Sequence, residues 1–182
     1  MKKVFLTALI ALAAALPARA QTAGSDEPYR FELGFNPMSY LHQFGTNLWG
    51  GSFSLTMRRS ERVSYIADLS IHQRGGASPY AVSAYRFGLR YYAQARGKLT
   101  PFGEALAGGA NLSSVTTTVG TTTTSTPSHN GVAFAVGGGA DYFIRPWLSW
   151  RVLQADYSLM RAGGDTSNGV RIHTGAVFHF GH

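Results

Sequence analysis

Eight segments of this sequence alternate apolar residues with small or polar ones. In residues 85–91, for example, Tyr, Phe or Leu at every odd position alternates with Arg or Gly at every even position. Successive side chains of a β-strand point to opposite faces, so this period of two predicts strands with one apolar and one polar face. The segments cover residues 29–36, 49–57, 63–72, 85–92, 102–112, 132–142, 152–159 and 170–180.

The N-terminus has a different character. Met1, Lys2 and Lys3 precede an apolar run over residues 4–16, and Pro17 ends that run. The following Ala-Arg-Ala has the small residues of a leader-peptidase site, so we predict a signal peptide over 1–20 that is cleaved on export. The alternative, a membrane anchor, is disfavoured because the run is shorter than the ~20 residues of a spanning helix.

Composition decides what the remaining chain can be. The sequence of 182 residues has no Cys and no second apolar stretch long enough for a membrane helix. It is 45% hydrophobic but only 14% charged, against about 25% charged residues in a typical soluble protein. The surface of a soluble domain would need more charge, so the apolar strand faces are expected to contact lipid.

A sheet in lipid must close, because hydrocarbon cannot satisfy the free N–H and C=O groups of an edge strand. The predicted fold is therefore all-β: an eight-stranded antiparallel transmembrane β-barrel with an up-and-down meander. A barrel of this size has room only for side chains inside, which predicts a filled polar lumen. We expect residues 21–27 to form a periplasmic N-terminal segment and residues 28–182 to form the barrel.

The connections between segments support this topology. Small outer-membrane barrels have short periplasmic turns and longer outer loops. With both termini in the periplasm, the predicted outer loops are residues 37–47, 73–79, 113–130 and 161–168, and the predicted inner turns are residues 58–62, 95–100 and 145–146. The third outer loop is a low-complexity Thr and Ser tract, which we expect to be a solvated hairpin or a mobile loop.

The polar faces of these strands carry the one cluster that suggests chemistry. Carboxylates and Arg are mixed in it, so they can neutralise one another as a packed polar core. A path for protons or small ions along the network is the alternative. The predicted lumen network comprises Glu32, Asp68, Arg86, Arg90, Asp141, Gln154, Asp156, Arg171 and His173. Arg151 interrupts the alternation of its segment, so we expect it at a membrane interface.

Other chemistry has little support. The His residues do not recur at metal-ligand spacings, and we place three of them, His42, His129 and His182, in loops or the tail. The glycines at 137–139 lie within a strand segment, where they let the wall bend or let aromatic neighbours cover the backbone, as we also expect of Gly108 and Gly109. No metal, cofactor or catalytic site is expected. After removal of the leader the basic residues are scattered singly, which argues against nucleic-acid binding.

Four motifs carry a resemblance to a known family: PFGEALAGGA at 101–110, FAVGGGAD at 134–141, QADY at 154–157 and RIHTGAVF at 171–178. Together they resemble the small outer-membrane barrels, the OmpA/OmpX-like β-barrel superfamily, and in particular short single-barrel members of acidobacterial type. The resemblance implies insertion into the outer membrane by the barrel assembly machinery, which would read Phe178 and Phe180 in the last strand. We expect the barrel to be a monomer and to contact outer-membrane lipid and lipopolysaccharide.

The expected function is a structural or surface-interaction role without catalysis. The alternatives are a narrow transport barrel for protons or small ions, and a lipid-modifying outer-membrane enzyme. For the enzyme, the nearest candidate pair is His173 and Thr174, but Gly175 stands where a Ser-type nucleophile would be needed. A soluble lipocalin-like barrel is the alternative fold. Against it stand aromatic residues near strand ends, which suit membrane girdles: Tyr29, Trp49, Tyr91, Tyr92, Tyr142, Trp147, Trp150 and Phe180.

Overall fold

The computed structural model describes residues 29–74, 80–113, 116–119, 122–125 and 128–181. The expected signal peptide over 1–20, the segment 21–27 and His182 lie outside these residues. No helix among the described residues is long and apolar enough to cross a membrane.

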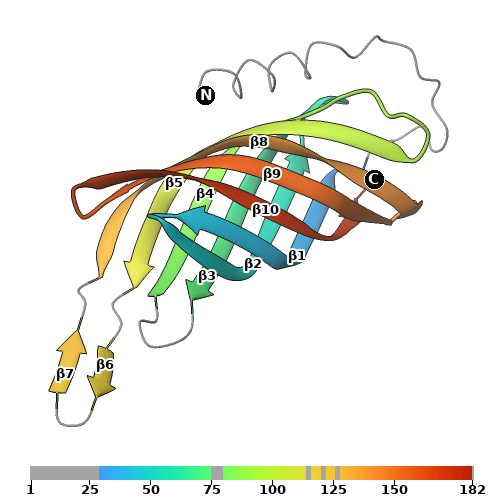
Figure 1. The fold of residues 1–182 in the computed structure, drawn as a ribbon. Coiled ribbons are helices and arrows are strands. Elements are labelled where there is room, and N and C mark those ends of the chain that lie inside the picture. The colour runs from blue at the N-terminus through green and yellow to red at the C-terminus, as the bar shows by residue number, and fades with distance from the viewer. Residues whose placement is uncertain (1–28, 75–79, 114–115, 120–121, 126–127, 182) are drawn as a thin grey trace, which may run out of the picture.

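Eight long strands form one closed antiparallel barrel, as predicted (Figure 1). Each strand pairs with its neighbours in the chain, and β1 pairs with β10 to close the sheet. The barrel strands are β1 (Phe31–Gln43), β2 (Thr46–Arg58), β3 (Val63–Arg74), β4 (Tyr80–Tyr92), β5 (Leu99–Ser113), β8 (His129–Arg145), β9 (Leu148–Ala162) and β10 (Asp165–Phe180). The fold class is therefore confirmed, including the meander order.

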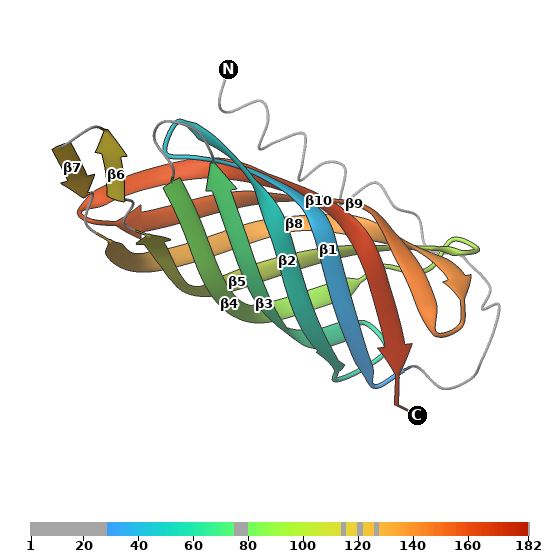
Figure 2. The ribbon, with the colours of Figure 1, turned by 90° about the horizontal axis from the view of Figure 1, so that it is seen from below.

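Two short strands, β6 (Thr116–Val119) and β7 (Thr122–Ser125), form a separate two-stranded sheet between β5 and β8. This hairpin lies within the Thr and Ser tract. It projects from the end of the barrel that is opposite the C-terminus (Figures 1 and 2). The tract thus contains a hairpin, one of the two forms that the sequence analysis left open, and its pairing is independent of the barrel sheet.

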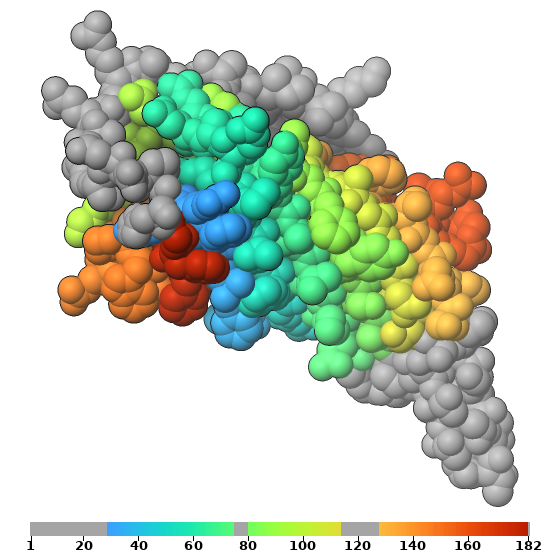
Figure 3. All heavy atoms as spheres, turned by 180° about the vertical axis from the view of Figure 1, so that it is seen from behind, coloured from blue at the N-terminus to red at the C-terminus, as the bar shows by residue number. Residues whose placement is uncertain are grey.

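The alternation of side chains sets the two faces of the wall. Outward residues such as Phe87 and Leu89 are 60% and 51% exposed, while the intervening Arg86 and Arg90 are buried. Figure 3 shows the outside of the wall as a continuous layer of side chains from neighbouring strands. The apolar face therefore points outward and the polar face inward, which is the reverse of a soluble lipocalin-like barrel.

Two of the predicted outer loops are wrong. The connection predicted over 37–47 is mostly strand, because β1 and β2 pair up to Gln43 and Thr46 and only Phe44 and Gly45 remain as a turn. The connection predicted over 161–168 is likewise strand, closed by Gly163 and Gly164. All four turn residues have positive φ angles, as two-residue type I′ hairpin turns require. These strands extend past the apolar segments, where the polarity of the residues concealed them.

Two bulges explain further differences from the predicted register. In β1, Pro37 and Met38 both point outward, and the pairing of β1 with both neighbours shifts there. Proline has no backbone N–H for the ladder, so it is tolerated at such a site. In β9, Val152 and Leu153 are both outward, at 51% and 52% exposure. Strict alternation with Gln154 and Asp156 in the segment 152–159 places Val152 inward, so its outward position is a correction.

The β9 bulge also corrects the position of Arg151. It was expected at a membrane interface because it broke the alternation. The bulge shifts the alternation of inward and outward side chains by one residue, so Arg151 points inward and is fully buried in the lumen. The cause is the extra residue that a bulge inserts into one strand, which reverses the faces beyond it.

The predicted aromatic girdle is present with two exceptions. Tyr92 points into the barrel and is only 5% exposed, because it continues the inward phase of Arg86 and Arg90 on β4. Tyr29 is half-buried and packs against His179. The other predicted girdle residues are exposed on the outer wall: Trp49, Tyr91, Tyr142, Trp147, Trp150 and Phe180.

One glycine shows why aromatic cover was expected. Gly109 on β5 lies directly opposite Tyr85 on β4. A Cβ at position 109 would lie 2.4 Å from the hydroxyl oxygen of Tyr85 and 2.5 Å from its Cζ. The ring of Tyr85 therefore covers the backbone of Gly109, and any larger residue there would have to displace it.

Candidate functional site

All nine residues of the predicted lumen network lie inside the barrel, with exposures of 0% to 2%. They do not act as isolated pairs. Gln154 on β9 donates from Nε2 to Glu104 Oε1 at 2.7 Å and to Asp156 Oδ1 at 3.1 Å. This amide joins a cluster near the middle of the barrel to a second cluster nearer the chain termini.

The middle cluster is built around Arg171 of β10. Its Nη1 donates to Asp68 Oδ1 at 2.7 Å, and its Nε donates to Asp156 Oδ2 at 2.9 Å. Arg86 pairs with the same Asp68 oxygen at 3.2 Å. Two guanidinium groups and two carboxylates from four strands therefore hold opposite walls of the barrel together.

The second cluster links β1, β2, β4 and β5. Arg90 donates from Nη2 to Glu104 Oε2 at 2.7 Å, and these two residues are a direct cross-strand pair. Tyr92 donates its hydroxyl proton to Glu32, which also accepts from Arg58 Nη2 at 2.9 Å. The sequence prediction omitted Glu104, because small residues blur the alternation of its strand. A correct pairing of the two strands would have placed Glu104 directly opposite Arg90, and this position could have identified it.

Arg151 and Asp141 form the remaining ion pair, with Nε to Oδ1 at 2.8 Å. The Arg151 guanidinium also lies 4.8 Å from the ring centroid of Phe102, and that of Arg90 lies 4.3 Å from the same centroid. Phe102 thus separates two like charges within the network. Aromatic rings stabilise such cations most where water is excluded.

Charge is balanced inside the barrel. Each inward carboxylate has at least one Arg partner, and each of these Arg residues has a carboxylate. The carboxylates are Glu32, Asp68, Glu104, Asp141 and Asp156, and the Arg residues are Arg58, Arg86, Arg90, Arg151 and Arg171. Removing one partner of such a buried pair costs about 3–5 kcal/mol, since the other charge stays buried and unpaired.

Above the polar network, at the end opposite the C-terminus, the lumen is apolar. Leu41 and Leu48 face each other across β1 and β2 and are 1% and 0% exposed. We call the cluster to which they belong the apolar plug. Its buried members are Leu41, Leu48, Val82, Ala84, Ala110, Leu112, Ala133, Met160 and Ala162. The sequence analysis missed the plug, and it placed two of its residues, Leu41 and Ala162, in loops because it ended their strands too early.

A serine, a histidine and a carboxylate also meet in the lumen. His173 Nδ1 lies 3.3 Å from Ser52 Oγ, and its Nε2 lies 3.6 Å from Asp156 Oδ2. This order resembles the nucleophile, base and acid of a hydrolase. All three side chains are buried, however, and Asp156 is already paired with Arg171. The predicted alternative of His173 with Thr174 is not formed, since Thr174 donates its hydroxyl to the Arg151 carbonyl oxygen at 2.7 Å.

The remaining sequence candidates are placed as follows. Phe178 and Phe180 of β10 point outward, and Phe180 stacks on Phe31 of β1 with a centroid distance of 5.9 Å. His42 and His129 lie in β1 and β8, which corrects their assignment to loops. Among the described residues, no group of three or more His, Asp or Glu side chains is arranged to hold a metal ion.

Comparison of the sequence with protein-family models and with curated proteins finds no match. Solved structures are similar in fold. Neisserial surface protein A superimposes with a TM-score of 0.60 at 11% identity, over 85% of this chain and 100% of that one. Ail, the attachment invasion locus protein of Yersinia pestis, gives 0.52 at 13% identity, over 81% and 96%. The outer membrane protein OprG of Pseudomonas aeruginosa gives 0.53 at 10% identity, over 85% and 97%. The chain therefore shares the closed β-barrel fold of these small outer-membrane proteins.

Proposed function

We propose that this protein is a closed, non-conducting barrel of the bacterial outer membrane, with a structural role or a role in contacts at its outer end. The observation that carries the proposal is the sealed lumen. A charge-balanced network of ion pairs fills one part of the barrel, and the apolar plug closes the part above it. A solute or ion would have to displace both.

The outer wall supports the membrane location. Large apolar side chains are exposed along every barrel strand except β5, whose outward residues are small; examples are Leu69 at 54%, Val136 at 53% and Ile172 at 40%. Contiguous apolar surface of this extent is typical of contact with lipid or a partner. Trp147, Trp150 and Tyr142 gather near one end of the wall, as membrane girdles do. Outer-membrane lipid is the expected partner of this surface.

The turns at the terminal end support the proposed orientation. Exposed basic residues occur in each of them: Arg59, Arg62, Arg96, Lys98 and Arg145. They would lie beside the phosphate groups of periplasmic-leaflet lipids. The β6–β7 hairpin would then extend outside the cell, since it projects from the opposite end.

Cleavage in intact cells tests location and orientation together. We would insert a site for a specific protease between β6 and β7 and, as a matched control, the same site in the turn between β2 and β3. The hairpin site should be cut in intact cells, whereas the control site should be cut only after the outer membrane is permeabilised. The reverse pattern would overturn the orientation, and protection of both sites would overturn the surface role.

Transport is the first alternative. A planar bilayer containing the folded protein should show no conductance steps, because the network lacks an unpaired charge to attract ions and the plug excludes water. Regular steps from the unmodified protein would favour transport instead. The lipid-modifying enzyme is the second alternative, and the burial of Ser52, His173 and Asp156 argues against it.

Assembly of the barrel would depend on Phe178 and Phe180, read by the barrel assembly machinery. Their outward position on β10 leaves both rings accessible before the barrel closes against β1. We propose a monomer, because the barrel has no unpaired edge in its sheet.

A further inference from the structure

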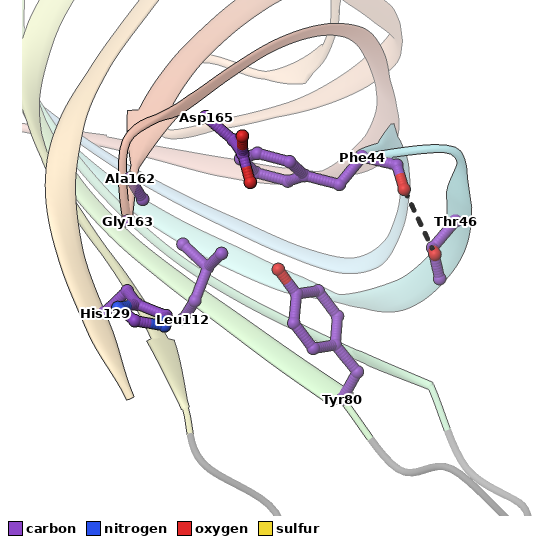
Figure 4. Close-up of a pocket in the computed structure, with 8 residues that line it drawn as sticks. All are labelled: Phe44, Thr46, Tyr80, Leu112, His129, Ala162, Gly163 and Asp165. Atoms are coloured by element: carbon purple, nitrogen blue, oxygen red, sulfur yellow. Dashed lines mark hydrogen bonds between the residues drawn. The ribbon is translucent and has the colours of Figure 1, made fainter. Parts of the chain in front are cut away.

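A cavity of about 280 Å³ opens at the end of the barrel above the apolar plug (Figure 4). It is shaped by residues from several strand ends that the chain brings together there. Its lining comprises Phe44, Thr46, Tyr80, Leu112, His129, Ala162, Gly163 and Asp165. Leu112 and Ala162 belong to the plug, so the cavity has an apolar floor and does not lead into the lumen.

One wall of the cavity is held in an unfavourable backbone conformation. Phe44 has a φ angle of 50°, and it is the one non-glycine residue with positive φ in the described chain. Asn is preferred at this position of a type I′ turn, whereas a bulky side chain there is strained by about 1–3 kcal/mol. Such strain persists only where the surroundings enforce it.

Contacts from β10 enforce it here. The Phe44 N–H donates to Ser167 Oγ at 2.8 Å, and Gln43 Nε2 donates to the Ser167 carbonyl oxygen at 2.8 Å. These two hydrogen bonds hold the β1–β2 turn against the neighbouring strand β10, and the Phe44 ring packs against the plug. The ring is therefore fixed as part of the cavity wall instead of pointing freely into solvent.

The lining has a definite chemical character. Phe44 and Tyr80 present aromatic rings, and Asp165 presents a carboxylate that has no ion-pair partner among the described residues. None of the described Arg or Lys residues lines the cavity. Aromatic faces and carboxylates both attract cations.

We propose that this cavity binds a small organic cation, an ammonium group on an apolar body, with the body on Leu112 and Ala162 and the charge at Asp165. Ligand sites usually measure about 300–1,000 Å³, so the ligand must be small. The inference extends the proposed surface role, and it rests on that proposal only for access from outside the cell. Binding by the purified protein does not depend on orientation.

The test uses 2-phenylethylammonium as the probe and 3-phenylpropionate as its anionic counterpart. Each is titrated into the folded full-length barrel in lipid nanodiscs, and binding is followed by calorimetry and by NMR shifts of residues around the cavity. The cation should bind saturably, and the anion should not. Equal binding of both probes, or no saturable binding of the cation, would overturn the proposal.

Two variants locate the site. Asp165→Asn should weaken cation binding about three- to fivefold, the amount expected for a partly exposed ion pair. Phe44→Asn should weaken it by a similar factor through loss of the ring, yet this variant keeps the fold because Asn-Gly is the favoured type I′ pair. Glu61→Gln removes the same charge at the other end of the barrel and should change nothing. Unchanged affinity in both cavity variants would contradict the site, whatever the conductance and protease experiments show.

Discussion

Arg151 of β9 donates two hydrogen bonds to Asp141 of β8, from Nε to Oδ1 at 2.8 Å and from Nη2 to Oδ2 at 3.0 Å. Both residues are buried, and they are directly paired across the two strands. The pairing exists only because the β9 bulge turns Arg151 inward. A bidentate contact of this kind fixes the orientation of the guanidinium as well as neutralising it.

Breaking this pair should therefore destabilise the barrel strongly. We expect Asp141→Asn to lower the free energy of unfolding by about 3–5 kcal/mol, since the Arg151 charge would stay buried without its partner. The measurement is urea unfolding in lipid vesicles, followed by tryptophan fluorescence.

The double variant Asp141→Asn, Arg151→Met provides the control. Because it removes the unpaired charge, it should be more stable than Asp141→Asn alone. If the losses of stability in Asp141→Asn and in the single variant Arg151→Met add in the double variant, the two side chains are not energetically coupled. Their ion pair then does not stabilise the bulge.

The apolar plug makes a second prediction. Leu48 is fully buried against Leu41, so Leu48→Ala should cost about 2–5 kcal/mol through lost contacts and a cavity. Leu153→Ala is the matched control, because Leu153 is 52% exposed on the outer wall. There the removed methyl groups are replaced by lipid, and the cost should be much smaller. Equal losses in the two variants would show that the plug is not a packed core.

The sequence predicted most of the barrel because its strands alternate strictly over the apolar band. Ser54 and Leu55 of β2, for instance, are adjacent in the chain yet 2% and 44% exposed. The prediction failed where that signal stops. Beyond the band the outer face of a strand meets water and is no longer apolar, so the contrast between its two faces is lost. Leu41 and Ser167 therefore gave no pattern, and these ends of β1 and β10 were taken for loops.

The lumen was predicted in part for the same reason. Asp68 and Arg86 lie on strands with unbroken alternation, and both were found. Arg151 was not, because a bulge reverses the faces of a strand without a reliable signature in a single sequence. Its partner Asp141 was found, because the extra residue at this register shift lies in β9 and the alternation of β8 continues through Asp141. Glu104 was missed because the small residues around it gave no contrast between the faces.

The outward face of the sheet can be tested at Leu69. This residue lies near the middle of β3, between Phe53 and Tyr85 on the neighbouring strands, and is 54% exposed. If it faces the hydrocarbon core, Leu69→Arg should cost about 2–4 kcal/mol in lipid vesicles. Leu69→Ala shortens the same side chain without adding charge and should cost far less. A small effect of both variants would mean that this face does not contact the membrane core.

The last strand separates assembly from stability. Phe180 and Phe31 stack across the seam where the barrel closes, and both rings lie on the outer wall next to the turn end. A surface aromatic pair contributes only about 0.5–1.5 kcal/mol beyond the area it buries. Phe180→Ala should therefore refold in vesicles almost as the unmodified protein does, and it should show the same shift in gel mobility on heating in SDS. If the assembly machinery reads Phe180, the same variant should accumulate less folded barrel in cells.

Phe31→Ala removes the other ring of the stack and leaves the last strand intact, so it should lose as little stability but assemble normally. Equal assembly defects in the two variants would assign the effect to the seam instead of to recognition of the terminal strand.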